Sequence, residues 1–392
     1  MSQLRLFSLF FLLLTLAGTQ GCSWFKSWGK NKDDPSAPAE LIEFSQTLPT
    51  RELWSHSVGS GIGKGEPQLR PVYWDGVIFA ADYKGRLVAV DAQSGAIRWE
   101  VKTELPLSGG PGVNGERLYV GTENGEVHAL NSRDGAPLWT AQVSSEILAA
   151  PVAGDGIVVV RCIDGRVFGL DEGSGRRIWI YDRSVPLLTL RGNSVPVIWA
   201  GIVYVGYDGG ETVALDIETG SVIWEQTVAT SEGRSELERL ADIDGQMIYV
   251  ASDLIVASYK NRLASLAADS GRLLWFKDIS SATGVMVDRT NLAISDKEGH
   301  LWLLDRRNGS TTWKQDQLSN RSLTRPSFMG GFVVVGDFEG YLHWVEVSSG
   351  QFAARQKVGG KGFVTGPLVV GNRLYVLTRK GKLVAYTAGG AG

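Results

Sequence analysis

The sequence predicts an all-β fold: an eight-bladed β-propeller made of four-stranded antiparallel blades. Three observations support this prediction. A segment recurs about every forty residues, each repeat has the size of four short strands, and the last copy is truncated while its missing strand stands near the N-terminus. No window after the N-terminus has helical periodicity long enough to predict a helix. A repeat of fixed length argues against a single catalytic pocket.

The repeat is clearest in four copies, each of which runs from a glycine to a tryptophan. They are GRLVAVDAQSGAIRW at 85–99, GEVHALNSRDGAPLW at 125–139, GRVFGLDEGSGRRIW at 165–179 and GETVALDIETGSVIW at 210–224. In each copy a short strand ends in Asp or Asn, and a Gly follows four residues later. This pairing indicates a turn, because the acid or amide caps the backbone while Gly adopts positive φ without steric cost. The repeated residues Asp91, Asn131, Asp171, Asp216 and Asp305 are therefore expected to form turns.

The tryptophan of each copy is expected to pack between neighbouring blades. It stands at positions 99, 139, 179, 224, 275 and 313, and Ala354 replaces it in the seventh copy. The eighth copy, GKLVAYT at 381–387, ends before its tryptophan. Residues 52–58, ELWSHSV, contain Trp54 and a strand pattern but no preceding copy of their own. We therefore expect this N-terminal strand to complete the last blade and close the ring, which removes exposed sheet edges.

Two intervals between copies are longer than the rest. The first glycines stand at 85, 125, 165, 210, 299, 340 and 381, with Asn261 in the fifth copy, so the intervals are 40, 40, 45, 51, 38, 41 and 41 residues. The extra residues lie in 181–196 and 229–244. Insertions in repeat proteins map to loops, often on the binding face.

Residues 1–21 are predicted to be a lipoprotein signal peptide. Arg5 supplies the positive start, and residues 6–16 form an apolar stretch too short to span a bilayer. Small residues then precede Cys22, the expected lipidation site, although Thr19 stands where Leu is usual. Ser23 follows, which favours the outer over the inner membrane. The alternative is an ordinary cleaved signal with an incidental Cys22.

The predicted domain organisation has two further parts. Residues 22–48 are expected to form the lipidated Cys and a flexible tether, because they are rich in Lys, Ser, Pro and Asp and lack a pattern. Residues 49–392 are expected to form the propeller. Cys162 has no second Cys to pair with if Cys22 is lipidated, so the ring must be held by its core. A net charge of −3 argues against nucleic acid as a partner.

No motif in the chain indicates catalysis or metal binding. The four His residues are not clustered, and His128 and His343 occupy the same repeat position in distant copies, so we expect no metal site and no cofactor. No nucleophile motif of the type G-x-S-x-G is present. The glycines at 59, 61 and 63 superficially resemble a phosphate loop, but they open no helix, and we expect a structural turn.

The two insertions are the candidate interaction sites. Residues 185–192, VPLLTLRG, place three leucines and an arginine in a loop, a composition typical of a protein interface. Alternatively, the leucines pack beneath the loop and form a small core of their own. Residues 236–244, ELERLADID, form an acidic second insertion on the adjacent blade, so both loops can face one partner.

The repeat pattern A-L-[ND]-x-x-[STD]-G-x-x-x-W resembles the repeat of the quinoprotein alcohol dehydrogenases. Within that superfamily the chain resembles the BamB family, lipoproteins of the outer-membrane β-barrel assembly (BAM) machinery. The most specific stretches are SVGSGIG at 57–63, LTLRGNSVP at 188–196, ERLADID at 238–244 and VVGDFEGYLHW at 334–344. The resemblance covers essentially the whole chain.

The resemblance implies a lipid-anchored propeller on the periplasmic face of the outer membrane of a Gram-negative bacterium. It implies binding to a periplasmic POTRA domain of BamA, the barrel-forming subunit, in a complex with other BAM lipoproteins. The positions that match the family's contact loops are Leu188, Leu190, Arg191, Asp242 and Asp244. They fall in the two insertions that the spacing marks.

Two function classes follow from the sequence. The first is a non-catalytic scaffold that supports folding and insertion of outer-membrane β-barrel proteins, with pairing of nascent strands at exposed edges as a further hypothesis. The second is a periplasmic dehydrogenase that depends on pyrroloquinoline quinone (PQQ). Such enzymes carry adjacent cysteines near the cofactor and a calcium site, and this chain has no adjacent cysteines.

Overall fold

The computed structural model describes residues 36–63, 68–184, 194–230, 241–260 and 262–389. The chain divides into two units, Met1–Ala37 and Pro38–Gly392, and the second unit contains all of the regular structure described below. Its described residues form strands and turns without a helix. Accordingly, no helix among them is long and apolar enough to cross a membrane.

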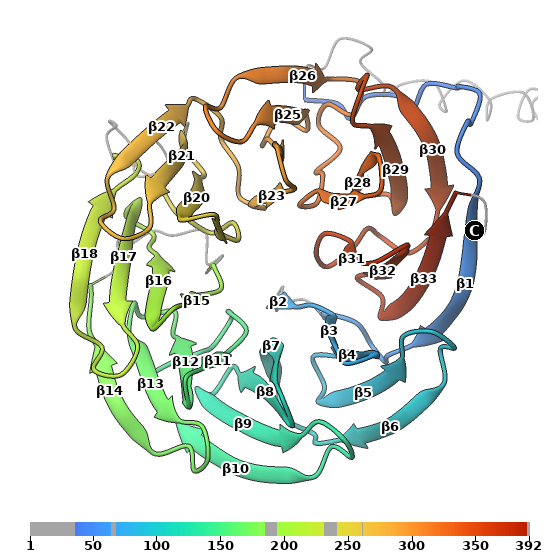
Figure 1. Cartoon of the computed structure of the whole chain (residues 1–392). Helices are drawn as coiled ribbons and strands as arrows, with labels where there is room; N and C mark the ends of the chain where they lie inside the picture. Colours follow the sequence, from blue (N-terminus) through green and yellow to red (C-terminus); the bar gives the residue numbers. More distant parts are fainter. Residues whose placement is uncertain (1–35, 64–67, 185–193, 231–240, 261, 390–392) are drawn as a thin grey trace, which may run out of the picture. The chain divides into compact units, whose positions relative to one another are not determined.

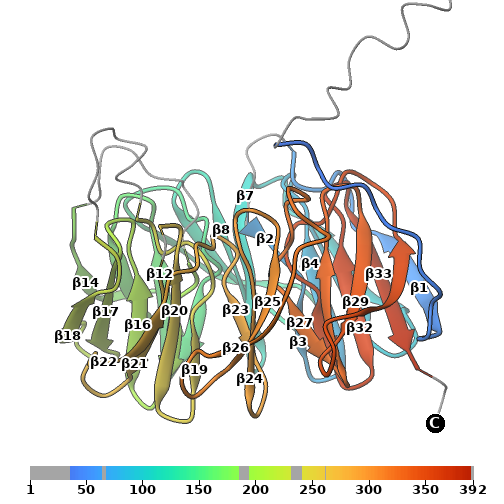
Figure 2. The same ribbon diagram turned by 90° about the horizontal axis from the view of Figure 1, so that it is seen from above.

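The second unit is a ring of eight sheets around a central channel, which confirms the predicted eight-bladed propeller (Figure 1). Each sheet runs from an inner strand at the channel to an outer strand at the rim. Figure 2 shows the same ring from its edge. Within a blade, strands that are joined by a short turn pair antiparallel, as the turns of the repeat lead us to expect.

The blades are numbered in chain order and their strands are given from the channel outward. Blades 1 to 4 contain β3 (Val72–Trp74), β4 (Val77–Ala81), β5 (Arg86–Asp91) and β6 (Ile97–Lys102); β7 (Leu107–Asn114), β8 (Arg117–Thr122), β9 (Glu126–Asn131) and β10 (Pro137–Gln142); β11 (Val152–Gly154), β12 (Ile157–Arg161), β13 (Val167–Asp171) and β14 (Arg177–Tyr181); β15 (Val197–Trp199), β16 (Ile202–Gly206), β17 (Glu211–Asp216) and β18 (Val222–Thr227). Blades 5 to 8 contain β19 (Ile248–Val250), β20 (Asp253–Ser258), β21 (Arg262–Ala267) and β22 (Leu273–Lys277); β23 (Val285–Val287), β24 (Asn291–Ser295), β25 (Leu301–Asp305) and β26 (Thr311–Gln315); β27 (Ser327–Met329), β28 (Phe332–Gly336), β29 (Tyr341–Glu346) and β30 (Phe352–Lys357); β31 (Leu368–Val370), β32 (Arg373–Leu377), β33 (Lys382–Ala388) and β1 (Thr50–Ser57).

The hydrophobic core lies between the blades rather than within one of them. The two middle strands of a blade are almost wholly buried, as β4 and β5 illustrate, because neighbouring blades cover both of their faces. One core cluster, for example, joins Phe79 of blade 1 to Leu118 and Val120 of blade 2. The outer strand β6 alternates between exposed and partly buried residues, because one of its faces meets solvent.

The repeated tryptophan packs between neighbouring blades, as the sequence predicts, and it meets the repeated turn glycine at every junction except that between blades 7 and 8, where Ala354 replaces it. Trp99 of blade 1 packs against Gly135 of blade 2, where a Cβ would lie 3.0 Å from the indole carbon Cε3. The Trp99 indole N–H donates to the Ser132 carbonyl at 2.9 Å, so the ring is also held by a hydrogen bond. The same Trp–Gly contact joins Trp54 to Gly95, Trp139 to Gly175, Trp179 to Gly220, Trp224 to Gly271, Trp275 to Gly309 and Trp313 to Gly350.

The N-terminal strand closes the ring, which confirms the prediction that residues 52–58 complete the last blade. β1 pairs antiparallel with β33 from Thr50 opposite Ala388 to Ser57 opposite Lys382. Trp54 packs on Gly95 of blade 1 and donates its indole N–H to the Ala92 carbonyl at 3.3 Å. The two ends of the propeller thus share blade 8, and no blade lacks its outer strand.

Two features near the N-terminus are not indicated by the repeat. A short strand, β2 (Gln68–Leu69), pairs parallel with β7 on the channel side and gives blade 2 a fifth strand. The glycines at 59, 61 and 63 have φ values of 136°, 78° and 65° and form a turn, as expected. The Asp82 carboxylate accepts a hydrogen bond from the Ser60 amide at 2.8 Å, which fixes this turn against blade 1.

Residues 39–48 lie on the ring, so contacts with the propeller begin earlier than the boundary at residue 49 that composition suggested. The Ala39 amide donates to the Ser319 carbonyl at 2.9 Å, and the Thr47 amide to the Ala353 carbonyl at 2.9 Å. Phe44 stacks on Phe352 with ring centroids 5.5 Å apart. The packed segment consequently contains the last part of the region assigned to the tether.

Candidate functional site

The residues that the family resemblance associates with function divide into two groups. Cys22, Leu188, Leu190 and Arg191 lie outside the described residues. Asp242 and Asp244 are described, and they lie in the segment that leads from blade 4 into blade 5.

The Asp242 segment is held between two blades through its backbone. The Ile243 amide donates to the Tyr207 carbonyl at 3.1 Å, and the Tyr259 amide donates to the Asp242 carbonyl at 2.8 Å. Asp242 is fully buried, whereas Asp244 is half-buried and lines the central cavity. The composition of this insertion did not indicate that one of its two aspartates is part of the packed structure.

Three carboxylates gather at this place. Asp208, Asp242 and Asp244 each present an oxygen within 4.8 Å of the others. The Arg161 guanidinium donates to Asp208 Oδ1 at 3.0 Å, and both of these side chains are buried. Arg161 also stands over the Tyr207 ring, 5.3 Å from its centroid. A second guanidinium, that of Arg183, stands over the same ring, 5.2 Å from its centroid. The cluster therefore combines carboxylates with arginines, a composition that can form charge-assisted contacts.

The central channel contains a cavity with a volume of about 1000 Å³. Arg70 and Arg325 both reach into it and donate to the same atom, Gln246 Oε1, each at 2.9 Å. Sequence reasoning missed these three residues. A signal was present, since Arg70 and Arg325 each precede a proline at the start of a repeat, where other copies carry small residues such as Ala150 and Gly366.

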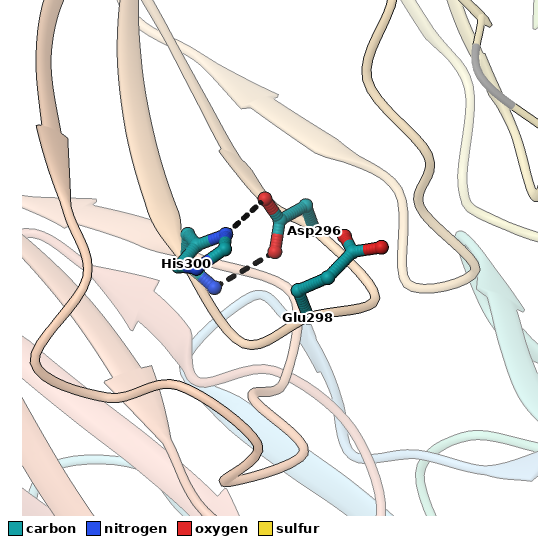
Figure 3. Close-up of side chains that lie close together, drawn as sticks. All are labelled: Asp296, Glu298 and His300. Atoms are coloured by element: carbon teal, nitrogen blue, oxygen red, sulfur yellow. Dashed lines mark hydrogen bonds and ion pairs between the residues drawn. The ribbon is translucent and has the colours of Figure 1, made fainter. Parts of the chain in front are cut away.

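Asp296, Glu298 and His300 lie at the edge of this cavity (Figure 3), and, like the three aspartates above, they are close enough together to be possible metal ligands. Asp296 Oδ2 accepts hydrogen bonds from His300 Nδ1 at 2.7 Å and from Trp302 Nε1 at 2.8 Å. Asp296 Oδ1 accepts the His300 amide at 2.8 Å. The same amide-capping contact recurs at Asp82 and Asp337 in other blades. The proximity of Asp296 to His300 is therefore explained by a turn of the repeat, and this group carries no assignment as a metal centre.

The remaining reactive side chains are separate from one another. His128 lies on β9 and His343 on β29, in blades 2 and 7, so the two do not meet, as the spacing predicts. Cys162 is fully buried, and burial raises the pKa of its thiol. A buried thiol with a raised pKa is a poor nucleophile and fits a packing role.

Comparison with known proteins identifies the family. A family profile described as "Outer membrane protein assembly factor BamB" matches residues 46–107 and 84–315. The protein of that name from Pseudomonas aeruginosa is 48% identical over 376 residues, which cover 96% of this chain and 97% of the relative. The one from Escherichia coli (strain K12) is 37% identical over 387 residues, with coverage of 96% and 97%.

Solved structures agree with this assignment. The crystal structure of BamB from Moraxella catarrhalis matches with a TM-score of 0.79 at 28% identity and covers 86% of this chain and all of the solved chain. A quinohemoprotein alcohol dehydrogenase from Comamonas testosteroni matches with a TM-score of 0.67 at 15% identity, which is a likeness of fold alone. The chain therefore belongs to the BamB family of outer membrane protein assembly factors.

Proposed function

We propose that this chain is a non-catalytic scaffold lipoprotein that binds BamA and supports folding and insertion of β-barrel proteins into the outer membrane. The observation that carries the proposal is identity of 35–48% to several proteins named outer membrane protein assembly factor, over nearly the full length of both chains. The fold supports it, since a rigid ring presents loops at fixed positions and supplies no unique catalytic constellation among the described residues.

The contact with a BamA POTRA domain is assigned to the two insertions. Leu188, Leu190 and Arg191 supply apolar area and one cation, and Asp242 and Asp244 supply two carboxylates. Asp244 is the better placed of the two aspartates for direct contact, because it keeps part of its surface exposed. Asp242 is buried, so its role is to hold the shape and charge of the segment.

This assignment predicts which substitutions break the complex. Replacing Leu188, Leu190 and Arg191 together by Ala should abolish co-purification with BamA from solubilised outer membranes. Asp244→Asn should weaken it about tenfold, the loss typical of one charge-assisted contact. The circular dichroism spectrum and melting temperature of the purified chain should stay unchanged in both variants.

A matched control uses the same residue types elsewhere on the ring. Leu138 is 47% exposed on β10, and Arg133 forms an exposed ion pair with Glu116. Replacing Leu138 and Arg133 by Ala should leave BamA recovery intact. Undiminished BamA binding by the Leu188, Leu190 and Arg191 variant would remove the assigned contact.

The lipid anchor is assigned to Cys22, in line with the lipoprotein signal of residues 1–21. Two or more acyl chains on this residue give stable attachment, whereas one chain gives only reversible binding. Cys22→Ser should move the protein from the outer-membrane fraction to the soluble periplasmic fraction. Membrane recovery equal to that of the unmodified sequence would contradict the anchor.

The enzyme alternative rests on likeness of fold to quinoprotein dehydrogenases at 13–15% identity, which does not extend to function. A direct discriminator is the absorbance of the purified chain after addition of PQQ and calcium. The scaffold assignment expects no stoichiometric uptake of the quinone. Tight, stoichiometric uptake would favour the enzyme instead.

A further inference from the structure

Arg70 and Arg325 occupy the same position of the repeat in two different blades. Each precedes a proline and stands two residues before an inner strand, β3 in blade 1 and β27 in blade 7. Gln246 stands two residues before β19 of blade 5, which is diametrically opposite blade 1 in a ring of eight. The equivalent residues of blades 3, 4 and 8 are Ala150, Val195 and Gly366, and all six of these residues line the central cavity.

The two guanidinium groups converge on one neutral acceptor. Arg70 Nη1 and Arg325 Nη1 each donate to Gln246 Oε1 at 2.9 Å. Arg325 is oriented further by Nε, which donates to the Val285 carbonyl at 2.7 Å. The Gln246 backbone is fixed as well, through a parallel bridge to Gly284. The site is thus built from three blades, and its three side chains hold one another in place.

Among the described residues neither guanidinium has an anionic partner, and the side-chain hydrogen bonds of the two arginines go to Gln246 and to groups of β23. Burial lowers the pKa of Arg70 to about 10. Burial lowers the pKa of Arg325 to about 9, with the nearby Arg70 charge acting in the same direction. Two half-buried cations that share one neutral acceptor repel each other, and an anionic ligand relieves that repulsion.

The Gln246 amide indicates the shape of an anion that the two guanidinium groups can bind. It differs from a carboxylate only by an NH₂ group in place of an oxygen, and its one oxygen already serves both guanidinium groups. Arg70 uses one of its five N–H donors in this contact, so other donors of its planar guanidinium group can bind an oxyanion.

The surroundings of the two arginines favour an anion with an apolar body. The cavity of about 1000 Å³ is lined by prolines and by aliphatic or aromatic side chains, including Val72, Met286 and Phe363, together with several serine and threonine residues. Its other charged lining residues are Asp244, Lys297 and Asp296, and the last of these already accepts hydrogen bonds from His300 and Trp302. An apolar wall with a few convergent polar donors is the usual composition of a small-ligand site.

We propose that Arg70 and Arg325 form a binding site in the central channel for a carboxylate attached to an apolar group. The carboxylate oxygens accept hydrogen bonds from the two guanidinium groups, and the apolar group lies against the channel wall. Asp244 of the assigned BamA contact lines the same cavity, but the groups of this site are Arg70, Gln246 and Arg325. Carboxylate binding and BamA co-purification are measured independently, so the failure of one assignment leaves the other standing.

Isothermal titration calorimetry on the full chain tests the site, with 4-phenylbutyrate as the probe and 4-phenylbutanamide as its uncharged counterpart. The acid should bind at millimolar concentration or below with a stoichiometry of one, and the amide should bind at least about tenfold more weakly. A short peptide ending in phenylalanine, with a free or an amidated C-terminus, distinguishes a peptide end from a small acid as the source of the carboxylate. Inorganic phosphate, which lacks an apolar group, should bind more weakly than the acid.

Substitutions locate the site. Arg70→Gln and Arg325→Gln should each weaken binding of the acid at least about tenfold, whereas Arg133→Gln on the exposed rim should not change it. Gln246→Glu keeps the side-chain shape and supplies a built-in carboxylate. It should abolish binding of the acid and raise the melting temperature, because the two cations gain a fixed counter-charge.

The proposal is overturned if the acid and the amide bind equally, if no carboxylate probe binds, or if phosphate binds more tightly than the acid. It is also overturned if Gln246→Glu leaves both the acid affinity and the melting temperature unchanged. This last variant keeps the test decisive even if the arginine variants fold poorly.

Discussion

The junction between blades is a contact between one tryptophan and one glycine, repeated around the ring. The indole ring covers the turn glycine of the next blade, and at every such contact except that of Trp275 its N–H donates to a backbone carbonyl, as Trp139 does to the Glu172 carbonyl at 3.0 Å. The glycine is required for two reasons, its positive φ and the absence of a Cβ that would enter the indole. Gly175 shows both, with a φ of 72° and a would-be Cβ 2.5 Å from Trp139 Cε3.

These two requirements can be separated by a pair of variants. Gly156 has a φ of 77° in the turn between β11 and β12, but a Cβ there meets no atom within 4 Å. Gly156→Ala should cost about 1 kcal/mol, from the left-handed backbone alone. Gly175→Ala should cost roughly 2–4 kcal/mol, because overpacking against Trp139 is added. Equal midpoints of the two variants in urea denaturation would exclude the steric part of this account.

At the scale of elements, residues 39–48 form a strap across the outer side of the ring. Phe44 lies on Phe352, and Arg355 stands over Phe44 while its Nη1 donates to the Ile42 carbonyl at 2.7 Å. The strap has no strand pairing along its length, so side-chain packing holds it between the backbone contacts at its two ends.

Removing one ring should therefore loosen the strap. Phe44→Ala should cost about 1–2 kcal/mol, less than for a fully buried Phe, because Phe44 is half-buried. The Thr47 and Leu48 amides, which donate to the Ala353 carbonyl, should exchange with deuterium faster in this variant. Ile42→Ala is the control, since Ile42 is 41% exposed and its side chain should contribute little. Unchanged exchange at Thr47 in the Phe44 variant would assign the strap to its backbone bonds.

The elements that could be predicted from the sequence are those specified by local chemistry. The turn at Asp91 and Gly95 repeats because an Asx cap and a positive φ are properties of a few adjacent residues. Trp54 could be assigned to the last blade because the eighth copy of the repeat lacks its tryptophan. Ring closure and blade number followed from these markers without any long-range information.

The features that the sequence did not predict depend on position relative to the ring axis. Arg70 and Arg325 are single arginines in the sequence, and only the ring brings them to the same atom of Gln246. Asp242 is likewise buried in a segment held from two blades, through the Ile243 amide to the Tyr207 carbonyl and through the Tyr259 amide to the Asp242 carbonyl. The partner loops were marked by their length, but length alone does not distinguish an exposed aspartate from a packed one.

At the scale of the whole molecule, β1 decides whether the propeller is a closed ring. Without it, β33 becomes an unpaired edge next to the buried face of blade 1, where Trp54 fills the junction. A chain that begins at Val58 should lose the cooperative melt and form dimers or aggregates through that edge. A chain that begins at Pro49 retains β1 and should stay monomeric with a modestly lower melting temperature.

Size-exclusion chromatography with light scattering, together with thermal denaturation, measures both outcomes. A monomeric chain lacking residues 50–57, with an unchanged melting temperature, would show that the remaining contacts close the ring without β1.

The pairing of β1 with β33 also sets an order of events for a chain that emerges amino end first. Glu52 and its hydrogen-bond partner Tyr386 are 334 positions apart, so the first strand must wait until nearly all later residues have appeared. During that interval both the waiting strand and each newly formed blade present open edges to their surroundings. The ring therefore closes only at the last step, and until then its open edges can pair with other chains.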